Sequence, residues 1–207
     1  MVLAVTSVGR YIALEGAEGC GKSTHAALLA ADIDAVLTRE TGGTDIGRAI
    51  RSILHDPANT ELTDKAEVLL IAADRAQHLE QIVRPALLAG RHVVSDRSVY
   101  SSLAYQGYGR GVSVDVVRRT SDWALGGTWP ELVLLIDVPV DVLVERMAER
   151  DLDRFERADD AFHARVRAGF AEMAANDPSR WLVIDGTATQ DAMARTIRAT
   201  VRERLGV

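Results

Sequence analysis

The sequence predicts a doubly wound α/β fold, in which helices cover both faces of a parallel β-sheet. Five short apolar runs alternate along the chain with amphipathic stretches, a pattern typical of this fold class. The runs are nearly continuous in Val, Ile and Leu, as expected of strands buried on both faces. The predicted strands are Tyr11–Glu15, Ala35–Thr38, His92–Asp96, Leu132–Asp137 and Trp181–Asp185. The predicted helical stretches are residues 23–32, 45–55, 64–89, 113–125, 139–149, 159–175 and 189–205.

A Gly-rich segment links the first predicted strand to the first predicted helix. It matches G-x-x-x-x-G-K-S/T, the pattern of the loop that binds nucleoside triphosphates. Its glycines let several backbone N–H groups converge on one anion at the N-terminus of a helix. Lys22 adds a positive charge, and the Ser23 hydroxyl can bind Mg²⁺. The predicted ATP-binding residues are Gly16, Ala17, Glu18, Gly19, Cys20, Gly21, Lys22, Ser23 and Thr24.

Charged residues follow two more of the predicted strands, at Arg39 and at Asp96-Arg97. Ligands of doubly wound folds bind at the carboxyl ends of the strands, so we expect these residues to face one crevice. Asp96 can hold magnesium through a water opposite Ser23, although an Asp here could also cap a helix. Two arginines suit the forked hydrogen bonding of an acceptor phosphate. Alternatively, Arg39 forms a surface ion pair with Glu40.

Two further segments have a composition that suits substrate binding. Residues 146–157 are rich in arginines and acidic residues, which suits a mobile lid that neutralises a transferring phosphoryl group. A solvated, salt-bridged helix is the competing interpretation. Residues 100–111 combine hydroxyls, an amide, aromatic rings and glycines, which suits recognition of a base and sugar. An ordinary Gly-rich loop is the alternative there.

Composition narrows the class of protein. The 207 residues predict a single domain over 1–207, and the net charge of −6 argues against nucleic-acid and anionic-membrane partners. One cysteine suits a reducing cytoplasm, and no apolar run reaches the roughly 18–20 residues that span a bilayer. Among the 24 basic residues only Lys22 and Lys65 are lysines, and one of them stands in the Gly-rich segment.

Together these motifs resemble those of bacterial thymidylate kinases, from about residue 10 to residue 205. The most specific are A-A-D-R-A-Q-H and A-Y-Q-G, in this order and spacing. The segments that carry the resemblance are Glu15–Ser23, Thr38–Thr44, Thr63–Leu70, Ala72–His78, Asp96-Arg97, Ser101–Gly107 and Asp153–Glu156.

The resemblance implies a P-loop nucleoside-monophosphate-kinase fold with a five-stranded parallel sheet and a short lid at about 146–157. It implies transfer of the γ-phosphate of ATP to dTMP with Mg²⁺, a step of dTTP synthesis, in a cytoplasmic homodimer. The metal-binding residues would be Ser23 and Asp96.

The resemblance also implies roles for single residues. Glu18 would lie near the acceptor sugar, Arg39 and Arg97 at the acceptor phosphate, and Arg75 at the thymine ring. The loop carries no arginine, so Arg150 and Arg154 of the lid would serve the transition state. The catalytic residues would thus be Lys22, Arg97, Arg150, Arg154 and Glu18. The substrate-binding residues would be Arg39, Arg75, Arg97, Ser102, Tyr105, Gln106 and Ile71.

The base pocket departs from the family pattern. Ile71 stands where an aromatic ring commonly stacks on thymine, and Leu37 stands where Phe is frequent. Thr41 and Ser98 replace a usual proline and a usual aromatic or His. A kinase for another pyrimidine or a modified thymidylate is therefore one alternative. A P-loop switch is another, although the chain has no N-K-x-D sequence to read guanine.

Overall fold

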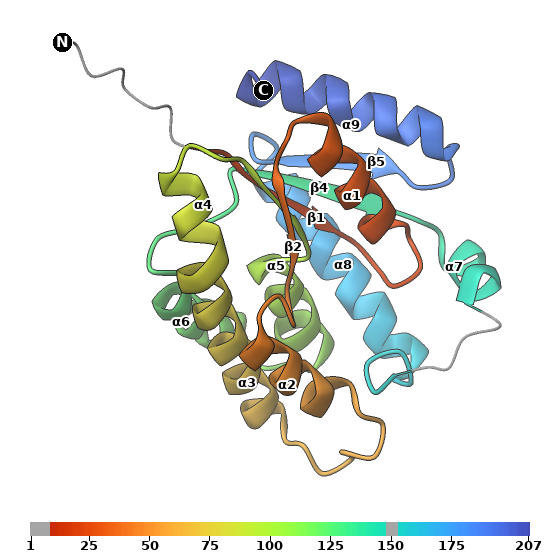
Figure 1. The fold of residues 1–207 in the computed structure, drawn as a ribbon. Helices are drawn as coiled ribbons and strands as arrows, with labels where there is room; N and C mark the ends of the chain where they lie inside the picture. Colours follow the sequence, from red (N-terminus) through yellow and green to blue (C-terminus); the bar gives the residue numbers. More distant parts are fainter. Residues whose placement is uncertain (1–8, 148–152) are drawn as a thin grey trace.

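The computed structural model describes residues 9–147 and 153–207, and it confirms the predicted α/β class. A five-stranded parallel sheet has the order β2-β3-β1-β4-β5, with helices on both faces (Figure 1). The strands are β1 (Tyr11–Glu15), β2 (Val36–Arg39), β3 (Val93–Asp96), β4 (Leu132–Asp137) and β5 (Trp181–Asp185). Every predicted strand is present within one residue at either end.

Alternating side chains of the strands belong to two separate hydrophobic clusters, one on each face of the sheet. Tyr11, Val93 and Val133 point to one face, where they join the larger cluster. Ile12 and Leu14 point to the other face and pack with the first and last helices of the chain. Burial on both faces explains why the strands read as continuous apolar runs rather than as an apolar–polar alternation.

Helices follow the predicted stretches closely. They are α1 (Lys22–Asp32), α2 (Asp45–His55), α3 (Asp64–His78), η1 (Leu79–Val83), α4 (Arg84–Leu88), α5 (Val99–Ser102), η2 (Leu103–Gly109), α6 (Val114–Leu125), α7 (Val140–Met147), α8 (Asp160–Asn176) and α9 (Gln190–Leu205). Side chains that accept a hydrogen bond from an N–H three residues on fix four of the starts, and each such cap typically contributes about 1 kcal/mol. They are Thr44, Thr63, Asp159 and Thr189.

Residues 99–109 are helical, so the interpretation of the segment 100–111 as an ordinary Gly-rich loop is wrong. Helix α5 continues directly into η2, a π-helix. Leu103, Ala104 and Tyr105 are buried in the larger cluster, and this burial outweighs the weak helix propensity of the glycines. A side chain at Gly109 would collide with Phe162 of α8, so glycine permits the close approach of the two helices.

The lid assigned to residues 146–157 is only partly described. The structure describes α7 as far as Met147 and the chain again from Asp153. Arg150 therefore lies outside the described residues. No helix among the described residues is long and apolar enough to cross a membrane.

Candidate active site

The loop after β1 has the backbone that its glycines predict. Gly16, Gly19 and Gly21 have positive φ angles, and Gly21 caps the N-terminus of α1. At Gly16 (φ 139°) an added Cβ would lie 2.5 Å from the carbonyl oxygen of Ile136 in β4. The loop thus packs directly against the neighbouring strand, and only glycine fits that approach.

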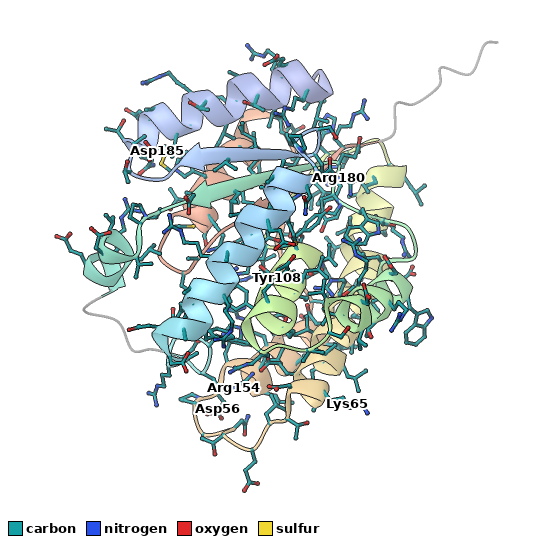
Figure 2. All side chains as sticks on the ribbon, turned by 180° about the vertical axis from the view of Figure 1, so that it is seen from behind. Asp56, Lys65, Tyr108, Arg154, Arg180 and Asp185 are labelled. Atoms are coloured by element: carbon teal, nitrogen blue, oxygen red, sulfur yellow. The ribbon has the colours of Figure 1, made fainter. Side chains whose placement is uncertain are left out.

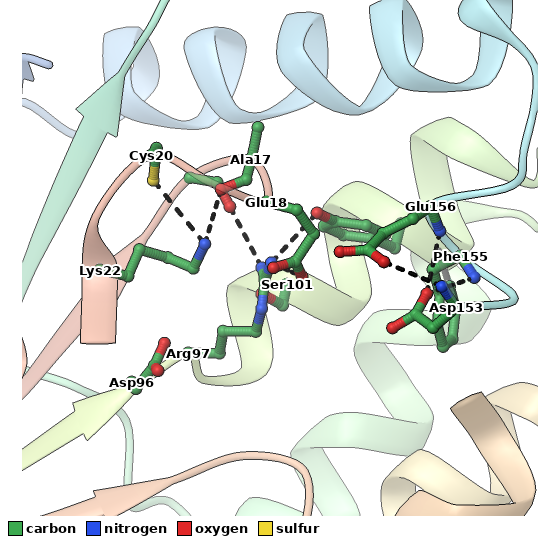
Figure 3. A network of polar contacts seen from close by, with 12 residues as sticks. Ala17, Glu18, Cys20, Lys22, Asp96, Arg97, Ser101, Asp153, Phe155 and Glu156 are labelled. Atoms are coloured by element: carbon green, nitrogen blue, oxygen red, sulfur yellow. Dashed lines mark hydrogen bonds and ion pairs between the residues drawn. The ribbon is translucent and has the colours of Figure 1, made fainter. Parts of the chain in front are cut away.

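Lys22 lies folded across the loop and is almost fully buried. Its Nζ donates a hydrogen bond to the carbonyl oxygen of Ala17 at 2.6 Å and contacts Cys20 Sγ at 3.7 Å (Figure 3). Among the described residues no carboxylate lies within ion-pair distance of this ammonium. The contacts described for this ammonium, to a carbonyl and a thiol, do not neutralise its charge, so it suits an anionic ligand.

Ser23 and Asp96 meet between the loop and the end of β3. The Ser23 hydroxyl lies 2.5 Å from Asp96 Oδ2, and Asp96 is mostly buried. The helix-cap alternative for Asp96 is wrong, because Ser98 caps α5 by accepting a hydrogen bond from the Tyr100 N–H. The described residues hold no group of three His, Cys, Asp or Glu that could bind a metal alone. A hydroxyl and one carboxylate nevertheless fit Mg²⁺, which completes its shell with water and phosphate oxygens.

Arg97 joins the loop to the pocket beside it. Its φ is 72°, and its guanidinium donates to Gly16 O (3.2 Å), Ser101 Oγ (2.9 Å) and Tyr105 OH (3.2 Å). It also forms an ion pair with Glu18 (Figure 3). Burial would raise the pKa of Glu18, but Arg97 and Lys22 outweigh it and hold that pKa below its usual range.

A pocket adjoins this ion pair and extends between α3 and η2. It encloses about 480 Å³ of empty space, counting the part open to solvent. Most of the predicted acceptor residues lie together in its wall: Glu18, Ile71, Arg75, Arg97, Ser102, Tyr105 and Gln106. The structure therefore brings together residues that are up to 88 positions apart in the sequence, from Glu18 to Gln106.

Arg75 forms the buried floor of the pocket. Only 1% of the residue is exposed. Its Nε donates to Glu40 Oε2 (2.9 Å), its Nη1 to Ser121 Oγ (3.1 Å) and its Nη2 to Ser102 Oγ (2.6 Å). Burial would raise the pKa of Glu40, yet Arg75 and His78 lower it overall. The fixed guanidinium presents donors only, because arginine has no acceptor atom.

Arg51 lines the pocket, although it was not singled out from the sequence. Its Nη1 lies 3.3 Å from both oxygens of Thr41, and burial together with the charges of Arg39 and Arg97 lowers its pKa. Arg51 and Arg97 thus bring two positive charges to the wall of one pocket, a composition that suits an anionic ligand. Its spacing along the helix would have indicated this location. Arg51 lies four residues after buried Gly47 and three before buried Leu54, so it shares their inward face of α2.

Arg39 lies at the exposed carboxyl end of β2 and outside the lining of the pocket. Its charge is close enough to act on Arg51. Its assignment to the acceptor phosphate stays a prediction. The alternative, an ion pair with Glu40, is wrong because Glu40 is buried and pairs with Arg75 and His78.

The described end of the predicted lid, residues 153–157, contacts α2 and α3. Arg154 Nε donates to the carbonyl oxygen of Leu54 at 2.8 Å, and its guanidinium pairs with Glu67 and lies over the Phe155 ring. Figure 2 shows Arg154 near the end of the molecule formed by α2 and α3. His55 Nδ1 lies 2.6 Å from Asp153 Oδ2. None of the hydrogen bonds described for the Arg154 guanidinium reaches the phosphate-binding loop.

His55 and Phe155 also line the pocket and were missed at the sequence level. They come from α2 and from the lid end, and their rings meet edge to face with centroids 5.2 Å apart. Only the docking of the lid end on α2 brings them to the pocket. No local pattern around either residue indicates that contact.

A phosphate-binding loop beside a second, arginine-bearing pocket at the carboxyl ends of parallel strands defines a nucleoside monophosphate kinase of the P-loop class. The family model for thymidylate kinase matches residues 14–197. The chain belongs to the thymidylate kinase family.

Individual relatives agree with the family match. The chain is 43% identical to a thymidylate kinase of Nitratidesulfovibrio vulgaris, over 94% of this chain and 97% of that protein. It is also 43% identical to a thymidylate kinase of Deinococcus radiodurans, over 96% and 98%. The crystal structure of thymidylate kinase from Ehrlichia chaffeensis superposes with a TM-score of 0.75 at 28% identity, covering 93% of this chain and 99% of that one.

Proposed function

We propose that the protein transfers the γ-phosphate of ATP to dTMP, forming dTDP on the route to dTTP. The observation that best supports this function is that the phosphate-binding loop lies next to the arginine-lined pocket. The loop that contains Lys22 and the pocket lined by Arg51 and Arg97 meet where Arg97 contacts Gly16. A donor phosphate and an acceptor phosphate would then lie side by side, which is the main requirement for phosphoryl transfer.

On the donor side, the backbone N–H groups of residues 16–24 would bind the phosphates of ATP. Lys22 would neutralise the charge that develops on the transferring group. Ser23 and Asp96 would hold Mg²⁺, which when bound neutralises phosphate charge and fixes phosphate geometry. The position of both oxygens beside the loop supports this assignment.

On the acceptor side, Arg97 and Arg51 would hold the phosphate of dTMP, with Arg39 at the edge. Glu18, fixed and kept ionised by Arg97, would contact the sugar. Arg75, Ser102, Tyr105, Gln106 and Ile71 would enclose the base. No strong general base is needed, because the acceptor oxygen is already anionic.

The lid would complete the site. Arg150 and Arg154 would neutralise charge on the transferring group, and Arg154 would leave Glu67 to do so. The whole chain would act as a single kinase domain with its lid at about 146–157. Since the substrates are intracellular nucleotides and the chain has one cysteine, we place the protein in the cytoplasm.

We also propose a homodimer. Neighbouring helices α2, α3 and α6 carry exposed apolar side chains. They are Ile46, Ile53, Leu69, Val116 and Trp123, the last of which is 88% exposed. Large apolar side chains exposed on neighbouring helices favour an interface between copies. Light scattering of the wild type and of Trp123→Glu tests it: a dimer that weakens in the variant supports the proposal, and a wild-type monomer overturns it.

A coupled assay across nucleoside monophosphates tests the activity itself. We expect ATP-dependent turnover with a clear preference for dTMP. Preference for dUMP, dCMP or dAMP would assign the enzyme to another acceptor, as the replacement of an aromatic ring by Ile71 allows. ATP binding without turnover on any monophosphate would identify a P-loop switch instead.

A further inference from the structure

Glu67 is a fully buried carboxylate that lies behind the pocket and joins it to the lid. It occupies α3 one turn before Ile71 and two turns before Arg75, on the same face. Its Oε1 accepts a hydrogen bond from Gln106 Nε2 at 2.7 Å. Its Oε2 pairs with Arg154, and both oxygens lie 3.5 Å from the Arg110 guanidinium.

This contact decides which way the Gln106 amide faces. An ionised carboxylate only accepts hydrogen bonds, so the NH₂ group of Gln106 must be the end that meets Glu67. The other end, the carbonyl oxygen, accepts no hydrogen bond from the described part of the chain. It is also absent from the buried polar atoms that lack a partner, and Gln106 lines the pocket. The pocket therefore receives an acceptor from Gln106.

The wall of the pocket thus pairs an acceptor with a group that only donates. Arg75 supplies the donors, and Glu67 keeps Gln106 an acceptor. An imide edge, with N–H beside C=O, complements both groups. Cytosine has an unprotonated ring nitrogen and an amino group at these positions. Its ring nitrogen would therefore face the Gln106 carbonyl, acceptor to acceptor, and its amino group would face Arg75, donor to donor.

We propose that Glu67 is a positioning residue for base selection: by fixing the Gln106 amide, it makes the pocket favour pyrimidines with an imide N–H and reject cytosine. The inference rests on the proposed function, because it concerns the acceptor of that reaction. Glu67 acts through Gln106 and touches no substrate itself.

The variant Glu67→Gln should reverse the orientation of the Gln106 amide. Arg154 and Arg110 only donate, so they draw the oxygen of the new amide to themselves. The NH₂ group of the new side chain at position 67 then faces Gln106. The Gln106 amide must therefore turn its carbonyl oxygen toward residue 67 and its own NH₂ group toward the pocket. Because an unpaired buried donor typically costs 1–3 kcal/mol, we expect the ratio of kcat/KM for dTMP over dCMP to fall about 10- to 100-fold.

A structural role alone predicts something different. If Glu67→Gln merely loosens the lid or the helix, kcat/KM falls by a similar factor for both nucleotides and the ratio stays. Glu80→Gln, the same change at an exposed position on the same continuous helix, serves as the matched control and should leave both values unchanged.

A second variant separates Glu67 from Gln106. Gln106→Met removes the amide, so discrimination should shrink, and adding Glu67→Gln to it should change the ratio no further. If the double variant loses as much additional discrimination as Glu67→Gln alone, Glu67 does not act through Gln106 and the proposal is wrong. If circular dichroism shows that Glu67→Gln fails to fold, Gln106→Met decides alone: an unchanged ratio overturns the proposal, and a reduced ratio supports it.

These outcomes are distinct from failure of the proposed function. A wild type that does not phosphorylate dTMP overturns the proposed function. A wild type that prefers dTMP, with a Glu67→Gln variant of unchanged preference, overturns only the role of Glu67.

Discussion

The Ser23 hydroxyl and the Asp96 carboxylate share a hydrogen bond of 2.5 Å that connects the start of α1 to the end of β3. The two residues are 73 positions apart, yet the pairing of β1 with β3 brings the loop beside the strand end. The position of Asp96 beside the ATP-binding loop therefore depends on the order of the strands in the sheet.

Asp96→Asn should weaken the use of magnesium. Replacing the carboxylate leaves a neutral amide beside Ser23, and hydrogen bonds to charged groups are worth about 1.5–3 kcal/mol, so the Mg²⁺ concentration for half-maximal activity should rise about tenfold or more. Titration of activity with Mg²⁺ measures it. Asp185→Asn, at the exposed end of the outer strand β5 (Figure 2), is the control and should behave as wild type. An unchanged magnesium requirement in Asp96→Asn would contradict the assignment.

Arg51→Ala should weaken acceptor binding more than Arg39→Ala. Arg51 lines the pocket, whereas Arg39 is exposed outside it. Loss of a charge-assisted contact worth about 1.5–3 kcal/mol predicts that the KM for dTMP rises roughly 10- to 100-fold in Arg51→Ala, with the KM for ATP nearly constant. Steady-state kinetics on both variants decide the order. A larger effect at Arg39 would move the acceptor phosphate to the end of β2.

Glu18→Gln should remove a stabilisation that depends on pH. The pKa of Glu18 is below its usual range in the folded protein, so its contribution is complete above the ordinary value of about 4.3 and disappears as the pH falls. The wild type should therefore melt at a higher temperature than the variant at pH 7, and the gap should begin to narrow as the pH falls below about 4.3. Thermal melts across this range measure it, and a gap of constant size would refute the ion pair.

Arg154→Ala should lower kcat by far more than it raises either KM. An arginine that neutralises charge only in the transition state affects turnover, and such arginines contribute up to 10³-fold or more. Single-turnover measurements isolate the chemical step. If the variant loses thermal stability but keeps its single-turnover rate, then Arg154 only docks the lid end on Glu67 and Leu54.

Gly16→Ala should abolish ATP binding and destabilise the protein beyond the conformational cost of a positive φ. The new Cβ would collide with the carbonyl oxygen of Ile136. Gly127→Ala isolates the conformational cost, because Gly127 has φ 85° but nothing within 4 Å of the added Cβ. We expect about 1 kcal/mol for Gly127→Ala and clearly more for Gly16→Ala in urea unfolding. Equal losses of unfolding free energy in the two variants would show that β4 moves to accommodate the new Cβ at position 16.

The donor half of the site was accessible from sequence because it is local. Eight consecutive residues carry the loop, and the same stretch supplies the glycines, Lys22 and Ser23. The sheet was accessible for a similar reason: continuous apolar runs mark strands that are covered on both faces.

The acceptor half is not local, and here the sequence-level prediction was incomplete. Arg51 and His55 lie on α2, and Phe155 lies in the lid end, so only the packing of distant segments makes them neighbours. The helical form of residues 99–109 was missed because glycines and hydroxyls dominate its composition. Burial of Tyr105 against Phe155, Phe162 and Phe170 overrides that local preference.

The burial of Lys22 gives the protein an unusual chemical handle. One of its two lysines is enclosed by the loop, and the other, Lys65, stands exposed at the start of α3 (Figure 2). Apart from the α-amino group, an amine-directed dye or tether therefore has a single accessible target, two residues from Glu67. A fluorophore placed there would stand on the solvent side of α3, the helix whose buried side carries Glu67, without any engineered cysteine.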